Sequence, residues 1–298
     1  MSCELDALIV GAGPTGLVLA TQLQSYGTRF RIIDRLLDRT RESRALGVQA
    51  RTLELLQTLG LGERLVARGK TSTRLKLHLE GRAVAAVTLG DIGAVDTRFP
   101  FILFVSQAET EDVLNEYLRA SGVMIERGTA LVSYQREDDG VECLLQRGDG
   151  RQERIHARSL VGCDGAHSTV RKWSGIEFEG GSYPQDFVLG DIEADGPLEP
   201  NAINSFARGD GVAIFFPLGR PATSRVVAMN ADAQSETEAG RTSSPDIARA
   251  LQLSELQDLV NSPSPGVGND IGYVLILEEM LKALKVELEA QPAAQEAD

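Results

Sequence analysis

The chain has 298 residues, of which 42% are hydrophobic, and its formal net charge at pH 7 is -13. This length is enough for one large domain or two smaller ones, each with an apolar core. The acidic charge argues against nucleic acid and anionic membrane surfaces as partners, since both repel a negatively charged protein. The longest apolar run near the start, ALIVGAG, is far too short to span a bilayer and lacks the flanks of a secretory signal, so we expect a cytoplasmic protein.

The cysteines and histidines indicate neither a disulfide framework nor a metal site. The cysteines are odd in number and stand far apart in the chain: Cys3, Cys143 and Cys163. The histidines have no acidic or thiol neighbours at ligand spacing in the sequence: His78, His156 and His167. We therefore expect reduced thiols and no bound metal.

Residues 5–34 read as a β-α-β unit. An apolar strand at 5–10 leads through a turn at 11–16 into a segment with helical spacing at 17–23, and RFRIID at 29–34 reads as a second strand. The crossover rules make the two strands parallel and adjacent in one sheet. The unit therefore predicts a Rossmann-like α/β domain.

The turn of this unit, GAGPTG at 11–16, carries the glycine pattern of dinucleotide-binding proteins. Gly11 allows the tight turn, Gly13 leaves bare backbone for a pyrophosphate, and Gly16 lets helix and strand pack closely. The helix that follows offers unpaired amides and a positive dipole end to the phosphate. Asp34, at the end of the second strand, is placed to accept hydrogen bonds from a ribose diol, although an ordinary strand-end residue is the alternative. These features fit NAD and FAD equally well.

Two amphipathic helices are expected next. The segment VQARTLELLQTLGLG at 48–62 has an apolar stripe made of Val48, Leu55, Leu56 and Leu59. The segment SQAETEDVLNEYLRASG at 106–122 is the clearest helix of the sequence, with a capping box of Ser106 and Glu109 and a terminating Gly122. Its apolar stripe consists of Val113, Leu114, Tyr117 and Leu118.

From residue 123 the hydrophobic period becomes two, which predicts strands. Asp139-Gly140 and Asp149-Gly150 read as hairpin turns, so we expect a β-meander inserted into the α/β domain. The chain then returns through an apolar strand, SLVGCDG, to a helix start at AHSTVRKWSG. Residues 1–180 would form this first domain. Further strands within 181–232 predict a second, smaller antiparallel sheet.

Residues 233–298 are expected to form a linker and a helical tail. The segment ADAQSETEAGRTSSP is polar and rich in small residues, as loops are. The later segment VLILEEMLKALKVELEAQ has a strongly amphipathic helical pattern. We expect residues 274–290 to be available for a homodimer contact or for a partner helix.

Three further segments resemble class A flavoprotein monooxygenases, the para-hydroxybenzoate hydroxylase-like group. They are RESRALGVQARTLELL with Arg44, LFVSQAETEDVLNEYL with Gln107, and VGCDGAHSTVRK with Asp164 and Gly165. Their order and spacing are specific, and the resemblance covers residues 5 to about 230. It implies FAD as the cofactor. The absence of a Tyr-x-x-x-Lys pair also argues against a simple NAD-dependent dehydrogenase.

The resemblance implies which residues bind the cofactor and what the protein does. The expected FAD-binding residues are Gly11, Gly13, Pro14, Thr15, Gly16, Asp34, Arg35, Arg44, Gln107, Asp164 and Gly165. NADPH or NADH would reduce the flavin, the reduced flavin would react with O2, and an aromatic or polyketide-like small molecule would receive one oxygen atom. The sheet at 181–230 would cover the substrate. No catalytic acid or base can be named, because the flavin carries the chemistry in such enzymes.

One motif of the family is not found. The family has a late Gly-Asp pair that closes a strand before a proline- and glycine-rich loop and a helix, and its Asp binds the ribityl chain of the flavin. The Gly-Asp pairs of this chain come too early: Gly90-Asp91, Gly148-Asp149, Gly190-Asp191 and Gly209-Asp210. We therefore expect a shortened monooxygenase. The alternative is a non-catalytic FAD- or nucleotide-binding remnant with a partner-binding terminal helix.

Overall fold

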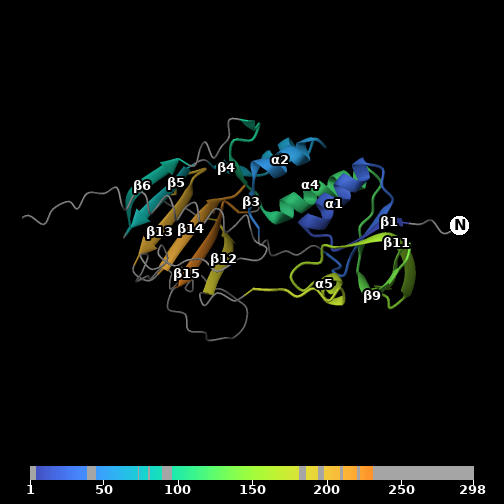
Figure 1. The fold of residues 1–298 in the computed structure, drawn as a ribbon. Coiled ribbons are helices and arrows are strands. Elements are labelled where there is room, and N and C mark those ends of the chain that lie inside the picture. The colour runs from blue at the N-terminus through green and yellow to red at the C-terminus, as the bar shows by residue number, and fades with distance from the viewer. Residues whose placement is uncertain are drawn as a thin grey trace, which may run out of the picture. The chain divides into compact units, whose positions relative to one another are not determined.

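The computed structural model describes residues 5–38, 45–72, 74–79, 81–88, 96–180, 186–193, 198–208, 211–219 and 222–230 (Figure 1). Its helices are α1 (Pro14–Ser25), α2 (Ala50–Gln57), α3 (Gly62–Val66), α4 (Gln107–Ala120) and α5 (Thr169–Trp173). Its strands are β1 (Leu5–Val10), β2 (Phe30–Asp34), β3 (Gly47–Val48), β4 (Lys70–Ser72), β5 (Arg74–Leu79), β6 (Arg82–Thr88), β7 (Ile102–Phe104), β8 (Glu126–Arg127), β9 (Thr129–Glu137), β10 (Gly140–Arg147), β11 (Gln152–Gly162), β12 (Asp186–Ile192), β13 (Ile203–Arg208), β14 (Gly211–Pro217) and β15 (Ser224–Asn230).

These elements fall into two compact units. The first takes its described residues from Met1–Arg44, Leu59–Leu65 and Gln107–Phe178. The second takes them from Ala45–Thr58, Val66–Ser106 and Glu179–Asp298. The first 106 residues therefore contribute to both units, while the expected division at residue 180 separates α5 from β12.

The first unit is built on a six-stranded sheet with the order β8-β2-β1-β11-β10-β9. β1 lies parallel between β2 and β11, with Leu8 opposite both Arg31 and Leu160. The predicted β-α-β unit is thus confirmed. The last four residues of β1 are buried, which explains the continuous apolar run, because a central parallel strand has both faces covered.

β11 is one continuous strand where the sequence predicts two separate ones. Its first half pairs antiparallel with β10 and its second half pairs parallel with β1, and Ala157 takes part in both pairings. β9 and β10 form the predicted hairpin, but the turn lies at Asp138-Asp139, one residue earlier than expected. The meander and the Rossmann strands therefore make a single sheet, because β11 is long enough to serve both.

α1 and α4 pack against each other in the first unit (Figure 1). Near their C-terminal ends, Nε2 of Gln24 donates a hydrogen bond to the carbonyl oxygen of Ser121 at 3.4 Å. α1 leads from β1 to the parallel β2, and α4 leads into β8, which is also parallel to β2. Both helices begin at the carboxyl edge of these strands, so their N termini lie at the same end of the unit. The predicted stripe of α4 is confirmed at its buried positions, Val113, Leu114 and Leu118.

The second unit contains a six-stranded sheet with the order β12-β15-β14-β13-β5-β6 and a three-stranded sheet with the order β3-β7-β4. The strands predicted between 181 and 232 are confirmed as β12 to β15. Their sheet is mixed, because β13 pairs parallel with β5, and it has as many strands as the sheet of the first unit. Its core consists of Leu46, Leu75, Leu77, Phe104, Ile203, Ile214, Phe216 and Leu218.

The apolar face predicted for the helix at 48–62 is partly wrong. α2 buries Leu53 and Leu56, whereas Leu55 is 49% exposed. Val48 belongs to the preceding strand β3. Each helical residue advances by about 100°, so the face that buries Leu53 and Leu56 turns Leu55 outward.

Several expectations lie outside the described residues. They concern Arg44, the turn at Gly209-Asp210 and the linker and tail after residue 230, including residues 274–290. None of the helices in the described part of the chain has the length and hydropathy that a membrane crossing requires.

Arg31 links three strands of the first sheet through its guanidinium. Its Nε lies 2.6 Å from Oε1 of Glu126 on β8, and its Nη1 lies 2.8 Å from Oε1 of Glu153 on β11. Hydrogen bonding to Arg31 holds the pKa of Glu153 below its ordinary value. The side chain of Arg31 is only 20% exposed, so its charge is partly desolvated.

We expect Arg31→Met to lower the free energy of unfolding by about 1–3 kcal/mol at neutral pH, because two partly buried carboxylates lose their shorter ion pairs and keep only those with Arg147, at 3.6 and 3.3 Å. The lowered folded-state pKa of Glu153 means that this stabilisation is complete above the unfolded value, about 4.3, and is lost as the pH falls through the folded value. Urea unfolding at several pH values measures the difference. Arg151→Met, which removes an exposed cation beside Asp149, is the control. Equal stability of wild type and Arg31→Met at neutral pH would contradict the prediction.

Candidate functional site

The first glycine of the GAGPTG turn packs directly against the end of β11. Gly11 has a φ of +104°, and a Cβ atom there would meet the carbonyl oxygen of Cys163 and lie 2.8 Å from the amide nitrogen of Asp164. The amide of Cys163 donates to the carbonyl oxygen of Val10 at 2.7 Å. Cys163 is a free thiol, and burial raises its pKa. Only glycine fits at residue 11, because both the backbone angle and the space exclude a side chain.

The other two glycines of the turn have opposite surroundings. A Cβ atom at Gly16 would collide with the carbonyl oxygen of Gly11, so α1 starts in backbone contact with the turn. A Cβ atom at Gly13 would have nothing within 4 Å. Two glycines therefore serve close packing and the middle one borders open space. This is the arrangement that a pyrophosphate against bare backbone requires.

The N terminus of α1 is suited to an anion. Gly13 is the N-cap residue with no side-chain capping bond, Pro14 starts the helix, and the first turn contains no acidic residue. The first intrahelical bond runs from the amide of Leu17 to the carbonyl oxygen of Gly13 at 2.9 Å. The amides of Thr15 and Gly16 thus have no acceptor within the helix, and they lie at the positive end of its dipole. A phosphate group would satisfy both the amides and the dipole.

The structure places Asp34 beside this turn. Its Oδ2 accepts a hydrogen bond from the amide of Ala12 at 2.8 Å, and its Oδ1 accepts one from the amide of Leu36 at 2.9 Å. Arg127 of β8, which the sequence analysis missed, lies with Nη1 3.5 Å from Oδ2. These contacts hold the carboxylate at the carboxyl end of β2, next to the start of α1. Arg35 follows Asp34 and is exposed.

Asp164 and Gly165 shape the loop that borders Gly11. Oδ1 of Asp164 accepts from the hydroxyl of Ser168 at 2.6 Å, and Oδ2 accepts from the amide of Thr169 at 2.6 Å. Gly165 has a φ of +77°, and its carbonyl oxygen accepts from the amide of Ser168 at 3.0 Å. Both carboxylate oxygens thus hold the start of α5. Asp164 therefore borders the glycine turn through its backbone and not through its carboxylate.

Gln107 is the first residue of α4, and the structure brings it to the same end of the first unit as the start of α1. Its Nε2 donates a hydrogen bond to Oε1 of Glu111 at 2.8 Å. The side chain of Glu111 is buried. The sequence analysis missed Glu111, because the apolar stripe of α4 was read from its hydrophobic residues alone.

Arg225 is a third residue that the sequence analysis missed, and it lies in the second unit. Its Nε and Nη2 donate to the two carboxylate oxygens of Asp191 at 2.6 and 2.8 Å, and its Nη1 donates to the carbonyl oxygen of Ala45 at 3.2 Å. The Arg225 side chain is 1% exposed. Ala45 directly follows Arg44 in the chain, so Arg225 fixes the backbone next to the arginine expected to contact flavin. The sequence feature that could have revealed Arg225 is a cationic residue within the otherwise apolar strand SRVVAM.

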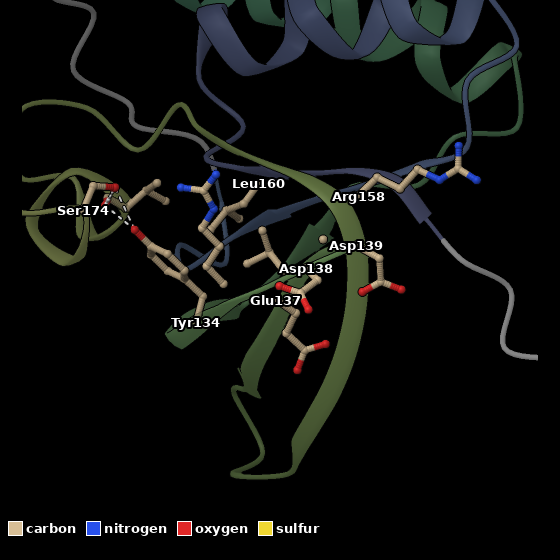
Figure 2. Close-up of a pocket in the computed structure, with 11 residues that line it drawn as sticks. Tyr134, Glu137, Asp138, Asp139, Arg158, Leu160 and Ser174 are labelled. Atoms are coloured by element: carbon tan, nitrogen blue, oxygen red, sulfur yellow. Dashed lines mark hydrogen bonds between the residues drawn. The ribbon is translucent and has the colours of Figure 1, made fainter.

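A cavity of about 490 Å³ lies elsewhere on the first unit, on the meander strands and α5 (Figure 2). Figure 2 shows Tyr134 directed toward Ser174, with Oη and Oγ 2.7 Å apart, and the acidic side chains of the β9–β10 turn at the other end. None of the residues that line this cavity belongs to the glycine turn, to α1 or to Asp34. The cavity is therefore separate from the glycine turn and the start of α1.

His156 lies close in space to two acidic residues of the β9–β10 hairpin. Nε2 of His156 lies 3.3 Å from Oδ1 of Asp139 and 3.7 Å from Oε2 of Glu137. His156 therefore has acidic neighbours at ligand spacing in space, and the three groups come close enough together for a cation. The spacing in the sequence does not reveal this, because His156 is on β11 and the carboxylates are across the sheet at the hairpin. The Asp139 side chain is 74% exposed, as in a surface ion pair.

Comparison with known proteins gives consistent matches. Residues 4–266 match the family model described as FAD binding domain. The 6-methylpretetramide 4-monooxygenase of Streptomyces rimosus is 37% identical over 222 residues, which cover 74% of this chain and 39% of that protein. The rifampicin monooxygenase of Streptomyces venezuelae is 38% identical over 188 residues, which cover 63% of this chain and 37% of that protein. The structure of the anhydrotetracycline hydroxylase OxyS from Streptomyces rimosus matches with a TM-score of 0.63 and 33% identity, over 83% of this chain and 48% of that one.

These matches agree with the glycine turn, the open position at Gly13 and the fold of the first unit. The chain spans about two fifths of the length of the two curated relatives, 39% and 37%. The matched family model nevertheless covers most of the chain, and the resemblance to flavoprotein monooxygenases is confirmed. The chain therefore belongs to the FAD binding domain family.

Proposed function

We propose that this protein is an FAD-dependent monooxygenase that hydroxylates an aromatic or polyketide-like small molecule. O2 supplies the oxygen atom and NADPH or NADH supplies two electrons, so that a C–H bond becomes C–OH and the second oxygen atom leaves as water. The observation that carries the proposal is the open Cβ position of Gly13 between two tightly packed glycines at the start of α1. The monooxygenase names of the relatives support it.

The pyrophosphate of FAD would bind at the start of α1. The amides of Thr15 and Gly16 would donate to its oxygens, and Gly13 would leave room for it. Pro14 starts the helix without an amide and presets its backbone angle. Asp34, held by the amide of Ala12, would accept hydrogen bonds from the adenosine ribose.

We assign the remaining cofactor contacts from where each residue lies relative to the proposed pyrophosphate and ribose sites. Arg35 follows the ribose-binding carboxylate, and Gln107 lies at the start of α4, at the same end of the unit as the pyrophosphate site. Asp164 and Gly165 stabilise the loop that packs against Gly11. Arg44 would reach the flavin from the segment before Ala45. Bound FAD supplies the electron-transfer and oxygen chemistry, and the protein binds and orients it.

The substrate class rests on what the relatives are named for. One is named for 6-methylpretetramide, one for anhydrotetracycline and one for rifampicin. We propose a multi-ring or phenolic substrate. We also propose a cytoplasmic location, and a homodimer or partner-helix contact at residues 274–290.

The first prediction of this proposal is that the purified chain carries flavin. Its visible absorption spectrum should show bound flavin, NADPH oxidation should rise when a phenolic or tetracycline-type compound is added, and the product mass should increase by one oxygen atom. Flavin binding without turnover on such compounds would favour the non-catalytic remnant. A protein that neither purifies with FAD nor binds added FAD would contradict both flavin functions.

Two alanine substitutions should separate cofactor binding from folding. Gly16→Ala should lower the free energy of unfolding by about 3 kcal/mol, because the new Cβ meets the Gly11 carbonyl oxygen. Gly13→Ala should change it by only about 1 kcal/mol, since its φ of -78° suits alanine and no atom lies within 4 Å of the new Cβ. Its FAD dissociation constant should nevertheless rise about tenfold or more, because the methyl group takes the space proposed for the pyrophosphate.

Urea unfolding without FAD and titration with FAD measure these two quantities on the same proteins. Gly148→Ala, at a turn where the nearest atom to the new Cβ is 3.5 Å away, is the control. Wild-type FAD affinity in Gly13→Ala would show that the pyrophosphate does not bind at the start of α1.

A further inference from the structure

Glu111 is the only aspartate or glutamate in the described part of the chain that is buried. Its side chain and backbone together are 3% exposed. It lies on α4 three and seven residues before Leu114 and Leu118, on the stripe of the helix that faces the protein interior. A carboxylate at such a position costs free energy relative to an apolar side chain of similar size. Packing alone therefore does not explain why a glutamate is there.

A hydrogen bond between Glu111 and Gln107 indicates the role of Glu111. Oε1 of Glu111 accepts a hydrogen bond from Nε2 of Gln107 at 2.8 Å, and the two residues are four apart on the same helix face. In this bond the carboxyl oxygen of Glu111 is the acceptor and the amide nitrogen of Gln107 is the donor. The amide oxygen of Gln107 is therefore turned away from this oxygen of Glu111.

The location of this pair connects it to the cofactor site. Gln107 is the first residue of α4, whose N terminus lies at the same end of the unit as the N terminus of α1. The glycine turn and Asp34 lie at that end. A carboxamide with a fixed orientation there offers its oxygen as a hydrogen-bond acceptor. Hydroxyl groups, which FAD carries on its ribose and its ribityl chain, are the donors that such an oxygen binds.

We propose that Glu111 is a positioning residue that orients the Gln107 carboxamide so that its oxygen accepts a hydrogen bond from a hydroxyl group of FAD. This inference rests on the proposed function, since it assumes that FAD binds at the start of α1. Glu111 itself does not touch the cofactor. It restricts the side-chain amide of Gln107 to one orientation before FAD binds. Its effect on FAD affinity therefore depends on Gln107.

The decisive variant is Glu111→Leu in the full chain. Leucine continues the apolar stripe of α4, so the unfolding midpoint without FAD should stay the same or rise. The FAD dissociation constant should rise about tenfold, which corresponds to about 1.4 kcal/mol, because the Gln107 amide loses its orientation. A residue that served only the fold would give the opposite pattern, with lower stability and unchanged affinity of the folded protein for FAD.

A double-mutant cycle tests whether the effect passes through Gln107. Gln107→Leu should weaken FAD binding, and Gln107→Leu combined with Glu111→Leu should bind FAD no more weakly than Gln107→Leu alone. Glu111→Gln should retain part of the affinity, because its amide oxygen still accepts a bond while its amide nitrogen allows a second orientation. This variant keeps the test available if Glu111→Leu does not fold.

Glu116→Gln is the matched control. It removes a carboxylate from the same helix, where Glu116 pairs with Arg64 at 2.6 Å and is 45% exposed, and should leave FAD binding unchanged. Wild-type affinity in Glu111→Leu, or independent and additive effects of the two substitutions, would overturn the inference. A wild-type protein that binds no FAD would instead reject the proposed function, so the two failures are distinguishable.

Discussion

The close backbone contact among Gly11, Gly16 and the end of β11 is the constraint on which the cofactor site depends. It brings the residue after the central strand β1, the first turn of α1 and the loop after β11 together without any side chain between them. This contact sets the start of α1 at the carboxyl edge of the sheet. It also leaves Gly13 facing open space, where the diphosphate of the proposed cofactor would meet helix amides instead of side chains.

Two buried ionisable side chains stand out in the described part of the chain, one in each unit. Glu111 in the first unit and Arg225 in the second each occupy a position that an apolar residue would fill at lower cost. Both make short hydrogen bonds, and both lie next to a segment that the family resemblance assigns to the flavin, Gln107 in one case and Arg44 in the other. Arg31 differs from them, because its partners are structural carboxylates of the sheet and its loss is expected to affect stability.

Much of the fold and part of the site could be predicted from the sequence, because they depend on short-range patterns. Patterns of neighbouring residues predict the glycine turn at 11–16, the helix beginning at Gln107 and the strands after residue 181. The structure contains all of them. The outward position of Leu55 and the continuity of β11 were missed. A hydrophobic residue shows that burial is favourable but does not say which face another element covers.

The sequence by itself determined the glycine turn and the β-α-β unit, since glycine conformation and hydrophobic period are local properties of the chain, and its resemblance to flavoprotein monooxygenases indicated FAD. Only the tertiary structure decided that Asp34 bonds to Ala12, that His156 meets the β9–β10 turn, and that Arg225 joins Asp191 to Ala45. Those contacts depend on strand order and register. Order and register are set by packing between residues far apart in the chain, which no stretch of sequence specifies alone.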